Sequence, residues 1–274
     1  MDLALDGNAA LVTAGSAGLG RASALALAEA GADVAVCGRT TERLVEAREE
    51  LLAAGPGDVL AVEADITDEG AVESFVERTV DEFGRLDHVV TSAGGPPSGP
   101  FLDTGDGDWY RAYDLLVMSA VWTTRAAYPH LVEAATSHDG ANDAGGDAST
   151  IVNITSRSVQ EVIDGLVLSN SVRRAVIGLM KTQAREFAPE VRVNAVLPGA
   201  HETDRIGDLI EQSVERGEYA DYEEGREEWS DGIPIERMGD PSELGEAVAW
   251  LSSPASSYVN GTAMPVDGGS LRSA

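Results

Sequence analysis

Two serines and an arginine in the second half of the chain have the types and spacing of a site that handles protons. In the stretch LSNSVRRAVIGLMK (168–181), Ser169 and Arg173 lie four residues apart, so a helix would place both on one face. Ser156 ends the run VNITS (152–156) and offers another hydroxyl. A hydroxyl beside a fixed cation is either an ordinary surface pair or part of a proton-transfer site.

A glycine-rich turn near the start of the chain could hold a phosphate. The stretch TAGSAGLG (13–20) follows the apolar run AALV (9–12) and precedes a helical pattern. Glycines let the backbone turn tightly and approach a pyrophosphate, whose charge then lies at a helix N-terminus. The turn predicts a dinucleotide site. The alternative is an ordinary turn between a strand and a helix.

The end of the next apolar run indicates which dinucleotide would bind. An acid at this point binds the free ribose hydroxyls of NAD. The sequence here is VAVCGRTTER, with Gly38 at the acid position, Arg39 next and Thr40 after it. A guanidinium can fork onto a 2′-phosphate, and Thr40 could add a hydroxyl. NADP(H) is therefore favoured over NAD(H), unless Arg39 is only a solvated loop residue.

The apolar pattern predicts the elements that position these residues. Helical spacing at 23–31, 41–55, 69–84 and 119–135 separates short apolar runs. The predicted strands are residues 9–12, 33–36, 59–64, 88–93, 150–155, 192–197 and 263–267. This alternation predicts an α/β fold of Rossmann type: a doubly wound parallel sheet with helices on both faces.

One domain is expected over residues 1–274, because no repeat and no linker interrupt the pattern. The small and polar stretch at 137–149 reads as an exposed loop. A second segment, at about 202–241, is acidic and reads as irregular. Its place after the run RVNAVLPG predicts a lid-like segment over a pocket.

The charge of the chain is far from balanced. Asp and Glu number 47 against 19 Lys and Arg, which gives a net charge of −28, and Lys181 is the only lysine. Self-repulsion on this scale strains a compact fold unless salt screens it. The composition resembles that of proteins from extreme halophiles, and adaptation to high salt is expected. The alternative is a partner that binds acidic surfaces.

Composition also excludes several classes of function. No basic stripe could neutralise phosphates, so no nucleic-acid partner is expected. The single Cys37 excludes a cysteine-rich zinc site, and no metal site is predicted. No apolar run reaches about 18 residues and no basic segment opens the chain, so no membrane partner and a cytoplasmic location are expected.

Together these motifs resemble those of the short-chain dehydrogenases/reductases, in particular 3-oxoacyl-ACP reductases. The resemblance rests on TAGSAGLG (13–20), EADITD (63–68), VTSAGG (90–95), VNITS (152–156), RVNAVLPGAHET (192–203) and VNGTAMPVDGG (259–269), with Ala14 in place of the family's first glycine. It implies a small-molecule substrate and a cofactor-binding set. That set, besides Arg39 and Thr40, is Thr13, Gly15, Ser16, Gly18, Leu19, Gly20, Asp65, Ile66, Ala93, Gly94, Pro198, Gly199 and Thr203.

The resemblance also exposes a departure at the catalytic positions. It gives Ser156 the role of the catalytic serine, and the family's tyrosine and lysine then fall on Ser169 and Arg173. The family's supporting asparagine falls on Leu116, and no tyrosine lies between Tyr128 and Tyr219. Carbonyl reduction needs a proton for the forming alkoxide, and a serine hydroxyl is a poor acid. Arg173 could stabilise an oxyanion or hold the nicotinamide ribose.

Other groups could replace the missing phenol. The segment SRSVQEVIDG (156–165) contains Arg157, Gln160, Glu161 and Asp164, and a desolvated carboxyl there could gain a useful pKa. His201 has a suitable intrinsic pKa. In so acidic a chain the two carboxylates are otherwise solvated surface acids, and His201 is otherwise a loop histidine.

Three hypotheses for function follow. The first is an NADP(H)-dependent oxidoreductase of atypical mechanism, acting on a carbonyl or alcohol substrate such as a 3-oxoacyl compound. The second is an NADP(H)-binding protein without dehydrogenase activity, serving as a sensor or a partner subunit. The third is non-redox chemistry on the same fold.

The resemblance further implies a homodimer or homotetramer formed through helices at 119–131 and 172–184.

Overall fold

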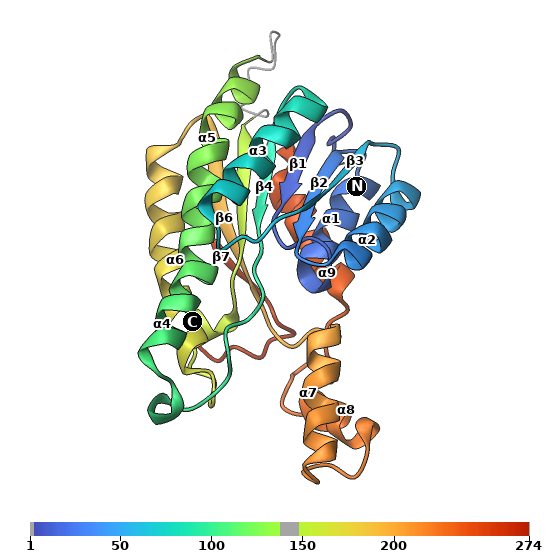
Figure 1. Ribbon diagram of the computed structural model, residues 1–274, viewed down its shortest axis with the longest axis vertical. Helices are drawn as coiled ribbons and strands as arrows, with labels where there is room; N and C mark the ends of the chain where they lie inside the picture. The colour runs from blue at the N-terminus through green and yellow to red at the C-terminus, as the bar shows by residue number, and fades with distance from the viewer. Residues whose placement is uncertain (1–2, 138–147, 274) are drawn as a thin grey trace.

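A computed structural model describes residues 3–137 and 148–273 of the protein (Figure 1). The loop expected at 137–149 lies almost entirely outside the described residues. The described part forms one sheet with helices against both of its faces.

Seven parallel strands form the sheet in the order β3-β2-β1-β4-β5-β6-β7. Their bounds are β1 Ala9–Val12, β2 Asp33–Gly38, β3 Val59–Glu63, β4 His88–Thr91, β5 Ser149–Ile154, β6 Val191–Pro198 and β7 Ala263–Val266. The order reverses between β1 and β4, and in open α/β sheets ligands bind beyond the carboxyl ends of the strands at such a point. The predicted fold class is confirmed.

Helices cover the sheet in two layers, and two further helices project from one end of the molecule (Figure 1). Their bounds are α1 Gly18–Glu29, α2 Thr41–Ala54, α3 Glu69–Phe83, α4 Asp106–Tyr113, α5 Ser119–Ser137, α6 Val167–Glu186, α7 Asp204–Glu215, α8 Tyr222–Ser230 and α9 Pro241–Ser252. A π-helical turn at 114–118 joins α4 to α5.

Alternation along the strands explains the two layers. On β1, Ala10 and Val12 pack in the core that contains residues of α1, α2 and α9, whereas Leu11 packs with residues of α3, α5 and α6. Successive strand side chains point to opposite faces. Because both faces are covered, the strands read as continuous apolar runs, as expected for a parallel sheet.

The segment at 202–241 is not irregular, and that expectation was wrong. It contains α7 and α8, which pack closely where Gly225 meets the fully buried Ile210. A β-carbon at Gly225 would lie 2.6 Å from Ile210 Cγ2, so the close approach requires glycine. Asp221 caps α8 by accepting a hydrogen bond from the backbone N–H of Glu224. The abundance of acids concealed the helical spacing of the few apolar residues.

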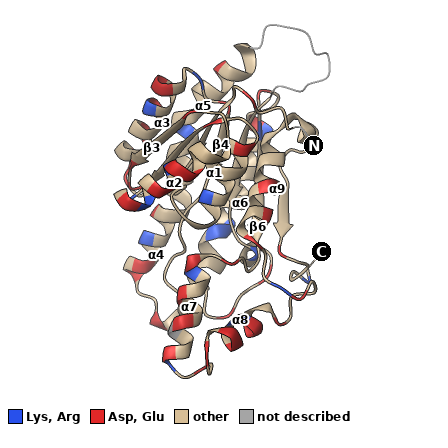
Figure 2. Cartoon of the chain, turned by 90° about the vertical axis from the view of Figure 1, so that its right-hand side faces the viewer, with Lys and Arg blue, Asp and Glu red and all other residues tan. Residues whose placement is uncertain are grey.

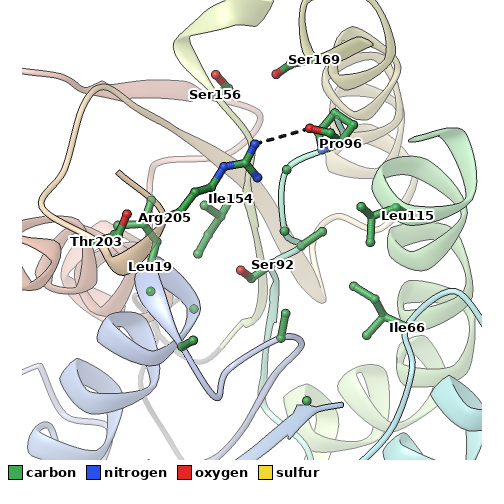
Figure 3. Close-up of a pocket in the computed structure, with 18 of the residues that line it drawn as sticks. Leu19, Ile66, Ser92, Pro96, Leu115, Ile154, Ser156, Ser169, Thr203 and Arg205 are labelled. Carbon is green, nitrogen blue, oxygen red and sulfur yellow. Dashed lines mark hydrogen bonds between the residues drawn. The ribbon is translucent and has the colours of Figure 1, made fainter. Parts of the chain in front are cut away.

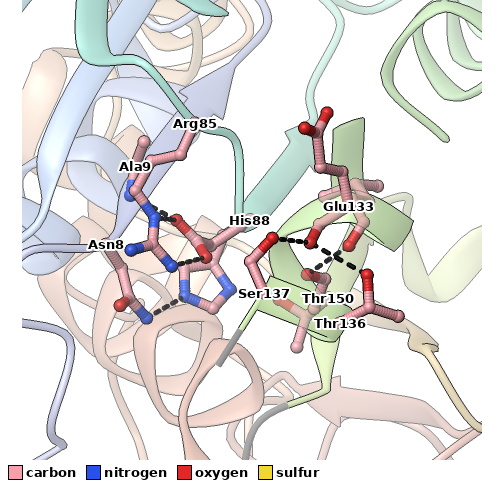
Figure 4. Close-up of polar contacts among 11 residues, drawn as sticks. Asn8, Ala9, Arg85, His88, Glu133, Thr136, Ser137 and Thr150 are labelled. Carbon is pink, nitrogen blue, oxygen red and sulfur yellow. Dashed lines mark hydrogen bonds and ion pairs between the residues drawn. The ribbon is translucent and has the colours of Figure 1, made fainter. Parts of the chain in front are cut away.

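A buried polar network fixes the amino-terminal ends of β1, β4 and β5, on the side of the sheet opposite the cleft-forming carboxyl ends (Figure 4). His88 is 3% exposed; its Nε2 accepts from Asn8 Nδ2 at 2.9 Å, and its Nδ1 lies 2.9 Å from Thr150 Oγ1. The neighbouring Asp87 accepts from the backbone N–H of Ala9 and from Arg85. Burial lowers the pKa of His88 to about 4, against the opposing charge of Asp87.

This pKa predicts a loss of stability as the pH falls. The unfolded chain binds a proton at His88 near pH 6.5, whereas the folded protein does so only near pH 4, so folding is penalised between these values. From pH 7 to pH 5 the wild type should lose about 2 kcal/mol more unfolding free energy than His88→Gln. Urea unfolding at constant salt measures the difference. His130→Gln, on α5, is the matched control and should keep the wild-type dependence; equal pH dependence in all three proteins would contradict the prediction.

Candidate active site

A cleft of about 820 Å³ lies at the carboxyl ends of the strands. All three predicted catalytic residues line it, and so do most of the predicted cofactor-binding residues. The predicted residues that line the cleft are Ser16, Gly18, Leu19, Gly20, Arg39, Thr40, Asp65, Ile66, Ala93, Gly94, Ser156, Ser169, Arg173, Pro198, Gly199 and Thr203. The fold therefore brings the glycine-rich turn and the serine–arginine pair into one space.

Thr13 and Gly15 do not line the cleft but shape the turn from behind. Thr13 Oγ1 donates to the backbone oxygen of Ser92 at 2.7 Å and accepts from its N–H at 2.8 Å, which ties the end of β1 to the end of β4. A β-carbon at Gly15 would lie 2.8 Å from Val36 Cγ1. Both residues act on the shape of the turn.

The turn leaves its inner surface as bare backbone. Gly18, at the start of α1, has φ +55°, and a β-carbon at Gly20 would lie 2.5 Å from the backbone oxygen of Ala14. Ala14 itself has φ +47°, a conformation that favours glycine and costs other residues about 1–2 kcal/mol. A backbone of this shape at a helix N-terminus fits a pyrophosphate.

Two arginines stand at the ribose end of the cleft. Arg39 and Arg43 both line it, together with Thr40. Gly38 stands where an acid would bind the NAD ribose, and a β-carbon there would require Ser16 to move. Arg43 was missed in the sequence, although its spacing of four residues from Arg39 was a usable signal.

Asp65 lies at the same end and stays ionised. Hydrogen bonds from the backbone and the side chain of Thr67 lower the pKa of Asp65, and the charge of Arg39 adds to the effect. A carboxylate in this state can accept hydrogen bonds from an adenine amino group.

Ser156 and Ser169 lie at the other end of the cleft (Figure 3), near Ser158 and Arg173. Ser169 Oγ lies 3.1 Å from Ser158 Oγ, and Ser156 Oγ accepts from the backbone N–H of Ser158 at 3.1 Å. Arg173 donates to the backbone oxygen of Thr155 at 3.2 Å and to that of Gly94 at 3.3 Å. Ser158 was missed in the sequence, and its place two residues after Ser156 was the only signal.

Arg173 is a buried cation. It is 8% exposed, and its Nε has no hydrogen-bond partner among the described residues. Desolvation, followed by the charge of Arg205, lowers the pKa of Arg173 to about 10. The guanidinium therefore remains protonated at neutral pH and can stabilise negative charge.

Leu116, the position at which the resemblance expects the family's asparagine, lies in an apolar cluster. Leu116 lies in the π-helical turn between α4 and α5 and packs in the same buried cluster as Leu168 and Val172 of α6. Its side chain cannot accept or donate a proton, so no polar chain leads from Arg173 through this position.

The proposed substitutes for the phenol occupy different surroundings. Arg157, Gln160, Glu161 and Asp164 do not line the cleft. Asp164 is exposed, and Glu161 Oε2 accepts from the backbone N–H of Arg272 at 3.2 Å.

His201 does line the cleft but is held by its surroundings. It is 3% exposed, its Nδ1 lies 3.3 Å from the backbone oxygen of Gly199, and its ring packs against Gly239. Burial lowers the pKa of His201, which favours the neutral ring. Among the described residues that line the cleft there is no tyrosine, lysine or glutamate.

Comparisons with known proteins agree with this geometry. A family model described as enoyl-(acyl carrier protein) reductase matches residues 13–270. The chain is 32% identical, over 97% of its length and 92% of the relative's, to an uncharacterised oxidoreductase of Mycobacterium tuberculosis. It is 28% identical to the 7alpha-hydroxysteroid dehydrogenase of Escherichia coli, over 99% of its own length and 97% of the relative's.

Solved structures with the same fold hold both kinds of nicotinamide cofactor. L-sorbose reductase from Gluconobacter frateurii, complexed with NADPH and L-sorbose, superposes with a TM-score of 0.90 at 27% identity, and the match covers all of both chains. A 7 alpha-hydroxysteroid dehydrogenase with NADH and 7-oxo glycochenodeoxycholic acid superposes with a TM-score of 0.81 at 28% identity, over 98% of this chain and 96% of that one.

Proposed function

Because this chain belongs to the short-chain dehydrogenase/reductase family, we propose that it is an NADP(H)-dependent oxidoreductase that interconverts an alcohol and a carbonyl compound. The observation that carries the proposal is the single cleft. It joins a glycine-rich turn with two arginines at its ribose end to Ser156 and Arg173 at its other end.

The residues at the ribose end fit NADP(H). Gly38 carries no acid, and Arg39 and Arg43 offer two guanidinium groups to a 2′-phosphate. Relatives with NADPH and with NADH share the fold, so the proposed preference rests on these residues at the ribose end of the cleft. When bound, the nicotinamide supplies or accepts the hydride.

Ser156 and Arg173 would act on the substrate oxygen. Ser156 lies just after β5, and its hydroxyl donates a hydrogen bond to the carbonyl oxygen of the substrate. Arg173 donates to the backbone oxygen of Thr155, the residue before Ser156, so its charge lies close to the same oxygen. As the alkoxide forms, the cation stabilises it.

Ser169 would act as a relay that passes a proton from another acid to the alkoxide, and would not itself be the source of that proton. Its hydroxyl contacts Ser158 Oγ, and Ser158 is fully buried, so this pair does not reach solvent by itself. We infer that water entering the cleft is the terminal acid. A water with no tuned pKa is a poorer acid than a phenol, so slow turnover is expected.

Cofactor binding without turnover is the second candidate. It is favoured by the lack of tyrosine and lysine among the described residues that line the cleft. Two measurements separate the candidates: calorimetry of NADPH and NADH binding in concentrated KCl, and NADPH oxidation with a panel of ketones and 3-oxoacyl thioesters. Binding with turnover supports the enzyme, binding without turnover supports the second candidate, and product formation without a change in nicotinamide absorbance would support non-redox chemistry.

Adaptation to high salt is part of the proposal. Acids are spread over the outer helices, including α2, α7 and α8 (Figure 2). Raising KCl from about 0.1 M to about 1 M shortens the Debye length from about 10 Å to about 3 Å and screens their repulsion.

The unfolding free energy is therefore expected to rise by at least about 2 kcal/mol over this range, a large share of the stability of a typical domain. Urea unfolding followed by circular dichroism measures it. Sucrose of equal osmolarity, which does not screen charge, is the control and should give a smaller gain. Stability that does not change with KCl would oppose the halophilic proposal and favour an acid-binding partner.

The remaining proposals concern surroundings and assembly. No helix in the described ranges has the length and apolar character needed to cross a membrane. We propose a cytoplasmic location, no nucleic-acid partner, and a homodimer or homotetramer that pairs through α5 and α6.

The segment that carries α7 and α8 borders the cleft at Thr203 and Arg205 and is proposed to act as its lid.

A further inference from the structure

Arg205 is a further cation at the end of the cleft that contains Arg173, and it was not singled out in the sequence. It lies in the first turn of α7, lines the cleft, and its Nη2 donates to the backbone oxygen of Pro96 at 3.4 Å. Figure 3 shows its side chain reaching from α7 towards Pro96, in the space below Ser156 and Ser169.

The two guanidinium groups lie close together. Arg173 donates to the backbone oxygen of Gly94 and Arg205 to that of Pro96, two residues further on. Two residues span at most about 7 Å of chain. Arg205 also packs so tightly on Gly95 that a β-carbon there would collide with its guanidinium.

Neither cation is neutralised by the protein. Eight ion pairs join arginines to acids in the described part of the chain, and none of them involves Arg173 or Arg205. Asp204 and Asp208 line the same cleft but form no ion pair with Arg205 there. Both guanidinium groups therefore remain available to an anion that enters the cleft.

We propose that Arg173 and Arg205 together bind a carboxylate of the substrate, so that the substrate is a small 2-oxo or 3-oxo acid or the matching hydroxy acid. This rests on the proposed oxidoreductase function. Arg173 reaches the carbonyl oxygen of Thr155, beside Ser156, so a carboxylate held there would lie next to the reacting carbonyl. Reduction then adds a hydride to the carbonyl carbon and a proton to its oxygen, and NADPH becomes NADP⁺.

The geometry fits a carboxylate better than a neutral group. Arg205 uses one of its five N–H donors on Pro96, and Arg173 uses one N–H of each Nη on a backbone oxygen, so both keep further N–H donors. Guanidinium and carboxylate form short, charge-assisted hydrogen bonds, often in pairs. The phosphates of the cofactor are the other source of negative charge, and the test must separate them from the substrate.

The test compares oxo acids with their methyl esters in the full-length protein at constant KCl. The pairs are 2-oxobutanoate with methyl 2-oxobutanoate, and acetoacetate with methyl acetoacetate. For wild type, kcat/KM with NADPH should be at least about 10-fold higher for one acid than for its ester. In Arg205→Met that advantage should disappear through a rise of about 30-fold in KM for the acid, while the ester changes less than about 3-fold.

Two measurements complete the test. Arg216→Met is the matched control, because Arg216 lies just after α7 and pairs with Glu218 outside the cleft; it should keep the preference for the acid. Calorimetry of NADPH binding to Arg205→Met should match wild type. A loss of NADPH affinity with equal losses for acid and ester would assign Arg205 to the cofactor and overturn the proposal.

Failure of the proposed carboxylate site gives a different result from failure of the proposed oxidoreductase activity. Turnover of esters or ketones without any preference for acids overturns the carboxylate site and leaves the oxidoreductase in place. If no substrate is turned over, calorimetry of oxamate, an unreactive 2-oxo acid analogue, with the NADP⁺-loaded protein decides. Binding that Arg205→Met abolishes supports the site without the activity, and no binding overturns both.

Discussion

Aspartate in place of Arg39 is expected to lower the preference for NADPH over NADH by about 1000-fold. Arg39 lines the ribose end of the cleft, where a charge-assisted bond to a 2′-phosphate contributes about 1.5–3 kcal/mol. The new carboxylate would also repel that phosphate and accept hydrogen bonds from the free hydroxyls of NADH. The ratio of the two dissociation constants, measured by calorimetry in concentrated KCl, reports the effect without requiring turnover.

Arg48→Asp is the control for this change. Arg48 is exposed on the same helix as Arg43, does not line the cleft, and its replacement alters the net charge of the protein by the same amount. It should leave the ratio within about 2-fold of wild type. If Arg39→Asp behaved in the same way, the 2′-phosphate would not lie at Arg39, and the prediction would be contradicted.

The strands could be predicted because burial on both faces leaves a simple signal. Val34, Ala35, Val36 and Cys37 are all fully buried, and a short apolar run of this kind between helical patterns is typical of a central strand in a parallel sheet. The glycine-rich turn was equally plain, since its glycines stand close together in the sequence, and a β-carbon at Gly20 would collide with the backbone oxygen of Ala14. In both cases the signal lies within a short stretch of the sequence.

The residues that were missed are brought to the cleft by tertiary contacts. Arg205 meets the backbone of Gly95 and Pro96, about a hundred positions earlier in the chain, and nothing in either segment announces that contact. Ser158 meets Ser169 only because the short turn after β5 folds back on α6. The two helices of the 202–241 segment were missed for another reason: each buries few side chains, so acids dominate its composition.

The resemblance implies that the family's asparagine and lysine positions are replaced together with the tyrosine position. Leu116 packs with Leu168 and Val172 where the family has a polar asparagine, and Arg173 reaches two backbone oxygens where the family has a lysine. Arg173 is thus fixed by backbone oxygens, and Leu116 by an apolar cluster that includes Val172.

Methionine in place of Arg173 is expected to lower kcat by about 100- to 1000-fold, the usual effect of removing one group that stabilises an oxyanion. Methionine fills similar space and carries no charge. The backbone oxygens of Thr155 and Gly94 would lose their donors, at a cost of about 1–3 kcal/mol of stability, so thermal unfolding must be followed alongside the rate. The rate is measured as NADPH oxidation at saturating substrate.

Two further variants locate the effect at the charge itself. Arg174→Met, at the exposed neighbouring position on α6, should retain the wild-type rate. Arg173→Lys keeps the cation but cannot span two carbonyl oxygens with a rigid fork, so it should recover only part of kcat. If Arg173→Met kept the wild-type rate in folded protein, the alkoxide would be stabilised elsewhere. Arg205 is the other cation that lines this end of the cleft, so Arg205→Met would then be expected to lower kcat where Arg173→Met did not.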